Sequence, residues 1–293
     1  MDNLNLVLPE IFVSLSVMFL LILGVFKKDS SQLTFNLSLI TILIAIIFVI
    51  NETFSVNRIT LFNDSVVIDH MASLMKIITL IGGFLVLGIS SNYLKTFKIF
   101  KIEYPILILS SVLGMMIMIS SNDLMVFYMG LELQSLALYV LATFNRDQLK
   151  SSEAGLKYFV LSALSSGLLL YGCSLIYGFS GSTNFDVIAN QLTSNEYALT
   201  FGIVFILVGL AFKISAVPFH MWAPDVYEGS PTTVTLFFTM VPKIAALTVF
   251  IRFLYVPFLN LIDQWQMIIV FLSIASMIFG AIAAIGQTNI KRL

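Results

Sequence analysis

Three charged residues lie inside stretches of the sequence that are otherwise apolar. Glu132, Lys213 and Lys243 each have hydrophobic neighbours on both sides. If these stretches cross a lipid bilayer, an ionised side chain near its centre costs about 2.5–3.5 kcal/mol even on a lenient insertion scale. Ionisable groups that are kept at such depth mark ion or proton pathways. The three residues are therefore candidates for chemistry, and the chemistry that they indicate is proton transfer.

A glutamate and lysines that are buried together can exchange protons. Loss of water favours the neutral form of each group, whereas attraction between a carboxylate and an ammonium favours the charged forms. Moving Glu132 away from its lysine would release a proton from the lysine, and closing the pair would favour recapture. We predict that Glu132, Lys213 and Lys243 form a proton relay.

Four other charged or titratable residues lie close to membrane depth. Lys157 begins an apolar segment, where it could reach the lipid headgroups or form the inward step from Lys213, and both alternatives stay open. His220 lies beside a predicted helix break and is a further relay candidate. Lys76 and Arg252 lie near the ends of their segments and are expected to extend toward the headgroups.

The composition indicates the kind of protein that positions these residues. Of the 293 residues, 59% are hydrophobic and 11% are charged, and the mean hydropathy is +1.00. Such values are typical of integral membrane proteins. A helix needs roughly 20 apolar residues to cross a bilayer. We predict an all-α, polytopic membrane bundle of about nine transmembrane helices, at 8–26, 34–50, 70–90, 104–120, 124–144, 155–178, 198–217, 232–256 and 264–286.

The seventh of these segments is predicted to be a broken helix. Residues 198–230 are too long for one span, and Pro218 lacks a backbone donor and would clash with the carbonyl four residues earlier. The following loop, 217–231, contains no Lys or Arg. Transporters place ion sites at breaks of this kind. Lys213, about one turn before Pro218, is expected to lie at such a site.

The basic residues outside the apolar segments predict how the chain is oriented. One side of the membrane would carry nearly all of them, and the other side would carry only Arg58. By the positive-inside rule the basic loops are cytoplasmic and the N-terminus is outside, and we expect a multi-pass protein of the bacterial inner (plasma) membrane. The residues on the basic side are Lys27, Lys28, Lys95, Lys98, Lys101, Arg146, Lys150, Lys291 and Arg292.

The sequence around the predicted break resembles a known family. Residues Phe212–Pro231, followed by Val241–Ala245, are similar to the subunit N family of proton-pumping NADH-quinone oxidoreductase (complex I). This family is one of the antiporter-like membrane subunits. The stretch PDVYEGSP at 224–231 resembles subunit N more than the related subunits L and M. A further match is Asn122–Leu124, which leads to Glu132.

The resemblance implies roles and boundaries. Glu132 would be the fifth-helix glutamate, Lys213 the broken-helix lysine and Lys243 the connecting lysine of the next helix. An N-terminal three-helix segment would cover 1–103, and a five-helix antiporter-like repeat that contains the broken helix would cover 104–256. Residues 257–293 would begin a second repeat. Family members continue into further helices, so we expect this chain to be C-terminally truncated.

The resemblance also implies a function. The protein would be a proton-translocating membrane subunit, driven by NADH oxidation and quinone reduction elsewhere in the complex. NADH, FMN, iron–sulfur clusters and quinone would bind in or near other subunits, and we expect no cofactor, metal or redox site in this chain. Its single cysteine, Cys173, cannot supply a four-thiolate cluster.

Partners follow from the same resemblance. We expect the other membrane subunits of the complex, especially neighbouring antiporter-like subunits, together with lipid and protons, and not nucleic acid. Two alternatives stay open. One is a subunit of a sodium/proton antiporter, and the other is a structural or assembly subunit whose buried charges only pair helices.

Overall fold

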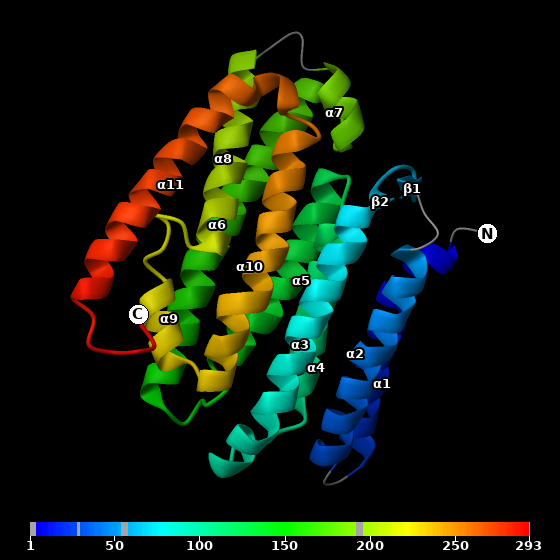
Figure 1. Cartoon of the computed structure of the whole chain (residues 1–293), viewed down its shortest axis with the longest axis vertical. Helices are drawn as coiled ribbons and strands as arrows, with labels where there is room; N and C mark the ends of the chain where they lie inside the picture. Colours follow the sequence, from blue (N-terminus) through cyan, green and yellow to red (C-terminus); the bar gives the residue numbers. More distant parts are fainter. Residues whose placement is uncertain (1–3, 28–29, 54–57, 192–195, 293) are drawn as a thin grey trace.

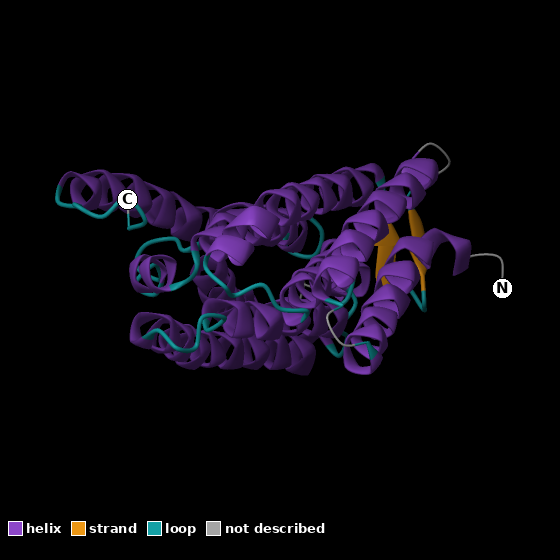
Figure 2. Cartoon of the chain, turned by 90° about the horizontal axis from the view of Figure 1, so that it is seen from below, coloured by secondary structure: helices purple, strands orange, loops and turns teal. Residues whose placement is uncertain are grey.

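Helices make up nearly all of the molecule, as Figure 1 shows for the whole chain and Figure 2 shows from one end. The computed structural model describes residues 4–27, 30–53, 58–191 and 196–292. A short antiparallel hairpin joins α2 to α3, formed by β1 (Ile59–Leu61) and β2 (Val66–Ile68). The helices are α1 (Leu8–Phe26), α2 (Ser31–Thr53), α3 (His70–Thr96), α4 (Glu103–Ile119), α5 (Leu124–Ala142), α6 (Leu149–Ser180), α7 (Phe185–Gln191), α8 (Glu196–Ile214), α9 (Ala223–Gly229), α10 (Thr232–Tyr255) and α11 (Ile262–Ile285).

Each of the nine predicted apolar segments coincides with one of these helices. Within the described residues, seven helices are long and apolar enough to cross a membrane: α1, α2, α3, α5, α6, α10 and α11. The other two apolar helices contribute shorter described stretches, Glu103–Ile119 of α4 and Leu199–Ile214 of α8. The prediction of an all-α membrane bundle is confirmed.

The long helices run along the length of the molecule, so their connections gather at two ends (Figure 1). We call the end with β1, β2 and α7 the hairpin end, and the end with α9 the loop end. The connections α1–α2, α3–α4 and α5–α6 all lie at the loop end. These connections carry most of the basic residues predicted for one side of the membrane, of which Lys28 lies outside the described residues.

Capping and ion pairing fix the hairpin end. Asp123 begins α5, because its carboxylate accepts a hydrogen bond from the backbone nitrogen of Met125 at 2.7 Å. The preceding Asn122 donates to Asp186 of α7 at 2.8 Å, and Arg58 pairs with Asp186 at 2.7 Å. Burial raises the pKa of Asp186, but the bonds from Asn122 and Arg58 outweigh it and hold the pKa below its usual value. The family-like Asn–Asp pair therefore fastens α7 over the start of α5.

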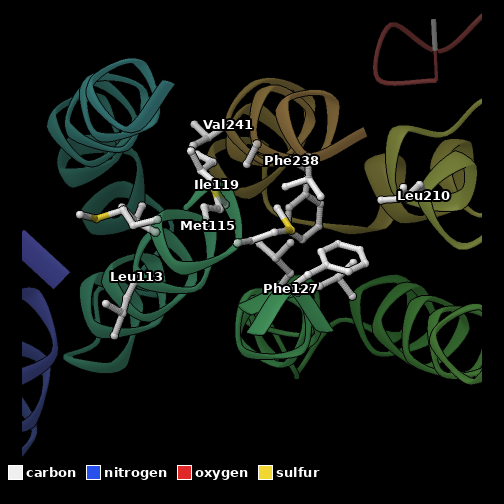
Figure 3. Packing of buried hydrophobic residues seen from close by; sticks show 14 of the residues in the cluster. Leu113, Met115, Ile119, Phe127, Leu210, Phe238 and Val241 are labelled. Carbon is white, nitrogen blue, oxygen red and sulfur yellow. The ribbon is translucent and has the colours of Figure 1, made fainter. Parts of the chain in front are cut away.

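A packed apolar core holds α4, α5 and α10 together. Figure 3 shows Met115, Ile119, Phe127 and Phe238 gathered between these helices, and each is buried. Because lipid is as apolar as these side chains, close van der Waals packing, and not release of water, holds such helices together. Since α5 carries Glu132 and α10 carries a candidate lysine, this core sets the spacing between the two parts of the candidate site.

Candidate functional site

The last turn of α8 ends in a left-handed residue. Ser215 has a φ of 60°, a conformation that glycine usually provides at this position. The backbone nitrogen of Ser215 donates to the carbonyl of Phe212 at 3.1 Å, and that of Ala216 donates to the carbonyl of Ala211 at 2.9 Å. This pair of bonds is the Schellman motif. The motif ends the helix at Ile214, one residue after Lys213, and leaves the Lys213 carbonyl free for another donor.

Side chains of the protein cover the non-helical backbone between α8 and α9. Pro218 lies in this interval, and α9 begins only at Ala223. The side chain of Trp222 fills the gap: its indole Nε1 donates to the carbonyl of Phe212 at 3.0 Å. The Trp222 ring stacks on Tyr158 of α6, with 4.6 Å between centroids. The polar backbone at the end of α8 is thereby shielded from lipid.

Lys213 is held by hydroxyl groups from two neighbouring helices. Its side chain is buried, with 6% of the residue exposed. The ammonium Nζ donates to Ser135 Oγ of α5 at 2.7 Å and to Ser162 Oγ of α6 at 2.8 Å. Tyr139 donates its hydroxyl to Ser162 at 2.6 Å, and its ring lies 5.9 Å from Lys213 Nζ. These dipoles replace part of the water that a buried charge loses.

Lys243 binds the end of the helix that carries Lys213. Its Nζ donates to the backbone carbonyl of Lys213 at 3.0 Å and is also bonded to the hydroxyl of Ser215. A cation is favoured at a helix C-terminus, where the carbonyl dipoles point. The same Nζ lies 4.9 Å from the ring of Trp222, which adds a cation–π attraction. Lys243 also borders a cavity of about 660 Å³ between α8, α9, α10 and α11.

Glu132 lies on α5, one turn before Ser135. It interacts electrostatically with Lys213. Within the described part of the chain, however, it makes no ion pair at 4.0 Å or less. Its Oε1 is buried and has no hydrogen-bond partner among the described residues. Glu132 is thus close enough to act on Lys213 through its charge, but the two side chains do not form an ion pair.

Lys157 lies at the loop end of α6. Its Nζ pairs with Asp225 of α9 at 2.8 Å and with Glu153 at 2.7 Å, and 43% of its side chain is exposed. Together with Trp222, Lys157 and Asp225 line a cavity of about 420 Å³. Lys157 is therefore paired with one acid on its own helix and with one on α9.

His220 lies in the same turn as Pro218 but faces α11. Its ring centroid lies 4.7 Å from that of Phe279. Its Nδ1 is buried and has no hydrogen-bond partner among the described residues. No group of three His, Cys, Asp or Glu side chains in the described ranges is placed to hold a metal ion. Among the five predicted residues, Lys243 is thus bonded to the backbone of Lys213, Glu132 acts on Lys213 through its charge, and Lys157 and His220 contact other groups.

Two expectations from the sequence were wrong. Arg252 does not extend to the headgroups, because only 4% of its side chain is exposed and it pairs with Asp69 at 2.9 Å. Asp69 also caps α3 by accepting from the backbone nitrogen of Ala72. Lys76 is likewise buried, in a pair with Glu10 of α1. Each cation is paired with a carboxylate on or just before another helix, which the sequence around the cation does not reveal.

Sequence reasoning also missed the serines that hold the lysines. Ser135 is three residues from Glu132 and so shares its face of the helix, a signal that could have been used. No spacing to a charged residue singled out Ser162 or Ser215 in the sequence, and serines are frequent in membrane proteins. Their roles depend on which helices become neighbours.

Substitutions of Ser215 are expected to separate its two roles. Ser215→Gly removes the left-handed strain, about 1 kcal/mol, but also removes the hydroxyl that contacts Lys243. Ser215→Ala removes the hydroxyl and keeps the strain. We expect the glycine variant to melt at the higher temperature of the two in detergent. Equal melting temperatures would contradict the assignment of strain.

Comparisons with known proteins identify the family. A family described as NADH:quinone oxidoreductase/Mrp antiporter, TM, matches residues 121–293. NADH-quinone oxidoreductase subunit N from Pelagibacter ubique (strain HTCC1062) is 75% identical over 293 residues, which are 100% of this chain and 62% of that protein. The chain therefore spans less than two thirds of the length of this relative.

Solved structures agree in fold. A chain of respiratory complex I from Thermus thermophilus, solved with bound aureothin, has a TM-score of 0.80 at 28% identity, covering 97% of this chain and 60% of that chain. A chain of the Mrp complex from Dietzia sp. DQ12-45-1b has a TM-score of 0.80 at 20% identity, covering 96% and 54%. The second match is a likeness of fold alone. The family match covers more than half of the chain and includes Glu132, Lys157, Lys213, His220 and Lys243, so the chain belongs to the NADH:quinone oxidoreductase/Mrp antiporter transmembrane family.

Proposed function

We propose that this chain forms part of a proton-translocating membrane subunit of an NADH-quinone oxidoreductase. NADH oxidation and quinone reduction in other subunits would drive protons through it. The name of the relative from Pelagibacter ubique supports the choice of complex. The observation that carries the transport role is the bond from Lys243 to the carbonyl of Lys213 at 3.0 Å. This bond brings the ammonium group of Lys243 to the end of the helix that carries Lys213.

The proposed mechanism uses the charges around this helix end. Two close ammonium groups repel each other, and more strongly in a protein interior than in water. Protonation of Lys213 therefore opposes protonation of Lys243. Glu132 acts in the other direction, because its carboxylate attracts the protonated form of Lys213. A charge shift that weakens this attraction would transfer the proton from the Lys213 ammonium to a neutral Lys243 amine.

Lys157 and His220 complete the proposed relay. Lys157, with Asp225, borders a cavity at the loop end and is suited to bring protons from that side toward Lys213. His220 faces α11 with an unpartnered Nδ1 among the described residues, and is suited to pass protons on beyond Lys243. The cavity of about 660 Å³ beside Lys243 is large enough for water that would receive a proton from this lysine.

The surrounding complex is part of the same proposal. NADH, FMN, iron–sulfur clusters and quinone would bind in or near other subunits, and the partners would be those membrane subunits, especially neighbouring antiporter-like ones, with lipid. The loop end would face the cytoplasm of a bacterial cell and the hairpin end the outside of the inner membrane. Residues 104–256 would be the first antiporter-like repeat, after the segment 1–103, and 257–293 would begin the second.

A sodium/proton antiporter subunit is the second candidate, since the family includes Mrp antiporters. It would use the same lysines and exchange sodium against protons. A structural subunit, in which the buried charges only pair helices, is the third. Proton movement and its dependence on sodium distinguish the three.

Glu132→Gln in the full-length subunit tests the proposal. The amide keeps the shape of the side chain but cannot attract a proton to Lys213. We expect an assembled complex with at least about tenfold less proton pumping in inverted vesicles, measured beside NADH-driven quinone reduction with and without sodium. Met129→Leu, on the exposed face of the same helix, is the control. Normal pumping by Glu132→Gln would favour the structural alternative, and pumping that requires sodium would favour the antiporter.

A further inference from the structure

A second pair of opposite charges is buried away from the Lys213 site. Glu10 lies in the first turn of α1, and Lys76 lies on α3. Lys76 Nζ is 2.5 Å from Glu10 Oε1, and the side chains are 2% and 10% exposed. Removing two charges from water costs several kcal/mol each, and a hydrophobic pair of similar volume often stabilises a protein as well. Packing alone gives little reason for charges at this place.

Glu10 and Lys76 could each form further hydrogen bonds. Glu10 Oε2 is buried and has no hydrogen-bond partner among the described residues. Lys76 Nζ has three donors, and its recorded polar contact is Glu10. Both side chains line a cavity of about 240 Å³, with Ser14 and Ser120 also in its wall. A water molecule occupies about 30 Å³ of the liquid, so several waters fit beside the free oxygen.

The pair lies on the hairpin side of the lysine site. On α3, Gly82 is about 9 Å further from the hairpin end than Lys76, at 1.5 Å per residue. Gly82 packs directly on Val241 of α10, since a Cβ at Gly82 would lie 2.8 Å from Val241 Cγ2. Val241 precedes Lys243 by two residues. The Glu10–Lys76 pair is therefore displaced from the level of Lys243 toward the hairpin end, opposite to Lys157.

We propose that Glu10 and Lys76 form a proton-exchange pair that serves the hairpin end of this subunit. The inference rests on the proposed function of Lys213 and Lys243. The Lys76 ammonium passes a proton to the Glu10 carboxylate, which gives a neutral amine and a carboxylic acid. The acid passes its proton to water in the cavity and becomes a carboxylate again. The amine takes up the next proton from the interior, so charge and atoms balance over the cycle.

The test compares neutral pairs in the full-length subunit of the assembled complex. The double variant Glu10→Gln with Lys76→Met removes both charges, so no unpaired charge is left buried. We expect it to assemble and to reduce quinone, with a loss in protons pumped per electron. The control is Arg58→Gln with Asp186→Asn, which neutralises an exposed pair at the same end and is expected to pump normally. A normal proton ratio in the Glu10–Lys76 double variant would overturn the inference.

A measurement on the unmodified complex does not depend on folding of the variants. A hydrophobic carbodiimide reacts with a carboxyl group that is protonated in an apolar setting. We expect mass spectrometry to find Glu10 labelled, and more so during turnover. Absence of label on Glu10 under both conditions would also overturn the inference. If Lys213→Ala stops pumping while the Glu10–Lys76 double variant pumps normally, only this inference fails; if Lys213→Ala pumps normally, the proposed function itself fails.

Discussion

Lys213→Ala in the full-length subunit is expected to lower proton pumping by about a hundredfold, the scale of a lost proton-transfer group. The variant removes the ammonium that Ser135 and Ser162 hold and that Lys243 opposes through the shared helix end. The methyl group of alanine cannot carry a proton, and it has no charge for the Glu132 carboxylate to attract. The measurement is proton uptake by inverted vesicles beside NADH-driven quinone reduction, after the complex is shown to be assembled.

Lys213→Arg separates the charge of this residue from its ability to release a proton. A guanidinium keeps the positive charge but does not deprotonate in proteins. If Lys213 only pairs helices, the arginine variant should pump nearly as well as the unmodified protein. If Lys213 passes protons, the arginine variant should assemble and still fail to pump. Lys101→Ala, which removes an exposed lysine at the loop end, is expected to change neither quantity.

The arrangement explains why Lys213 is placed at a helix end and not within a continuous helix, with the side chain of Lys243 bonded to that end from α10. An unbroken α8 would bond the Lys213 carbonyl to a backbone nitrogen four residues on. The Schellman end frees that carbonyl, and Lys243 takes it. Stabilising Lys243 therefore depends on the end of α8 at this point. A helix continued through Pro218 would lose the bond from Lys243 to the Lys213 carbonyl.

The sequence was sufficient for the long helices and for the lysines within them. An apolar run of about 20 residues has one stable state in lipid, so the run alone locates a helix, and a charge such as Lys213 stands out against it. The short elements carry no such signal. The β1–β2 hairpin and α7 are only a few residues long, and bonds among residues distant in the chain, such as Asn122 to Asp186, fix their positions.

The partners of the charges could not be predicted for a related reason. Lys76 and Arg252 looked able to reach the headgroups because the apolar stems of such residues can extend. The outcome depended on Glu10 and Asp69, which lie on or before other helices. Which faces of two helices meet is decided by packing of all their side chains, and that information is distributed over the whole chain.

Gly114→Leu is expected to have the largest effect on folding, because α4 and α5 touch through their backbones. A Cβ at Gly114 would lie 2.5 Å from the backbone nitrogen of Gln134 and 2.8 Å from the carbonyl oxygen of Gly130. Backbone atoms cannot rotate away, so the helices must separate. Overpacking of this kind costs about 1–3 kcal/mol or more, and we expect little assembled complex to be recovered from membranes.

Gly114→Ala gives a graded test of the same contact. It is expected to lower the melting temperature of the purified full-length subunit in detergent, since even one methyl group forces α5 outward. Gly88→Ala is the matched control: a Cβ there meets nothing within 4 Å, and alanine in a helix is favoured over glycine by about 1 kcal/mol, so its melting temperature should rise or stay unchanged. Only Gly114→Ala should therefore lower the melting temperature, and equal shifts in the two variants would contradict the backbone contact. Because α5 also carries Glu132 and Ser135, the surviving Gly114→Ala protein should pump less than its amount predicts, as Ser135 moves away from Lys213.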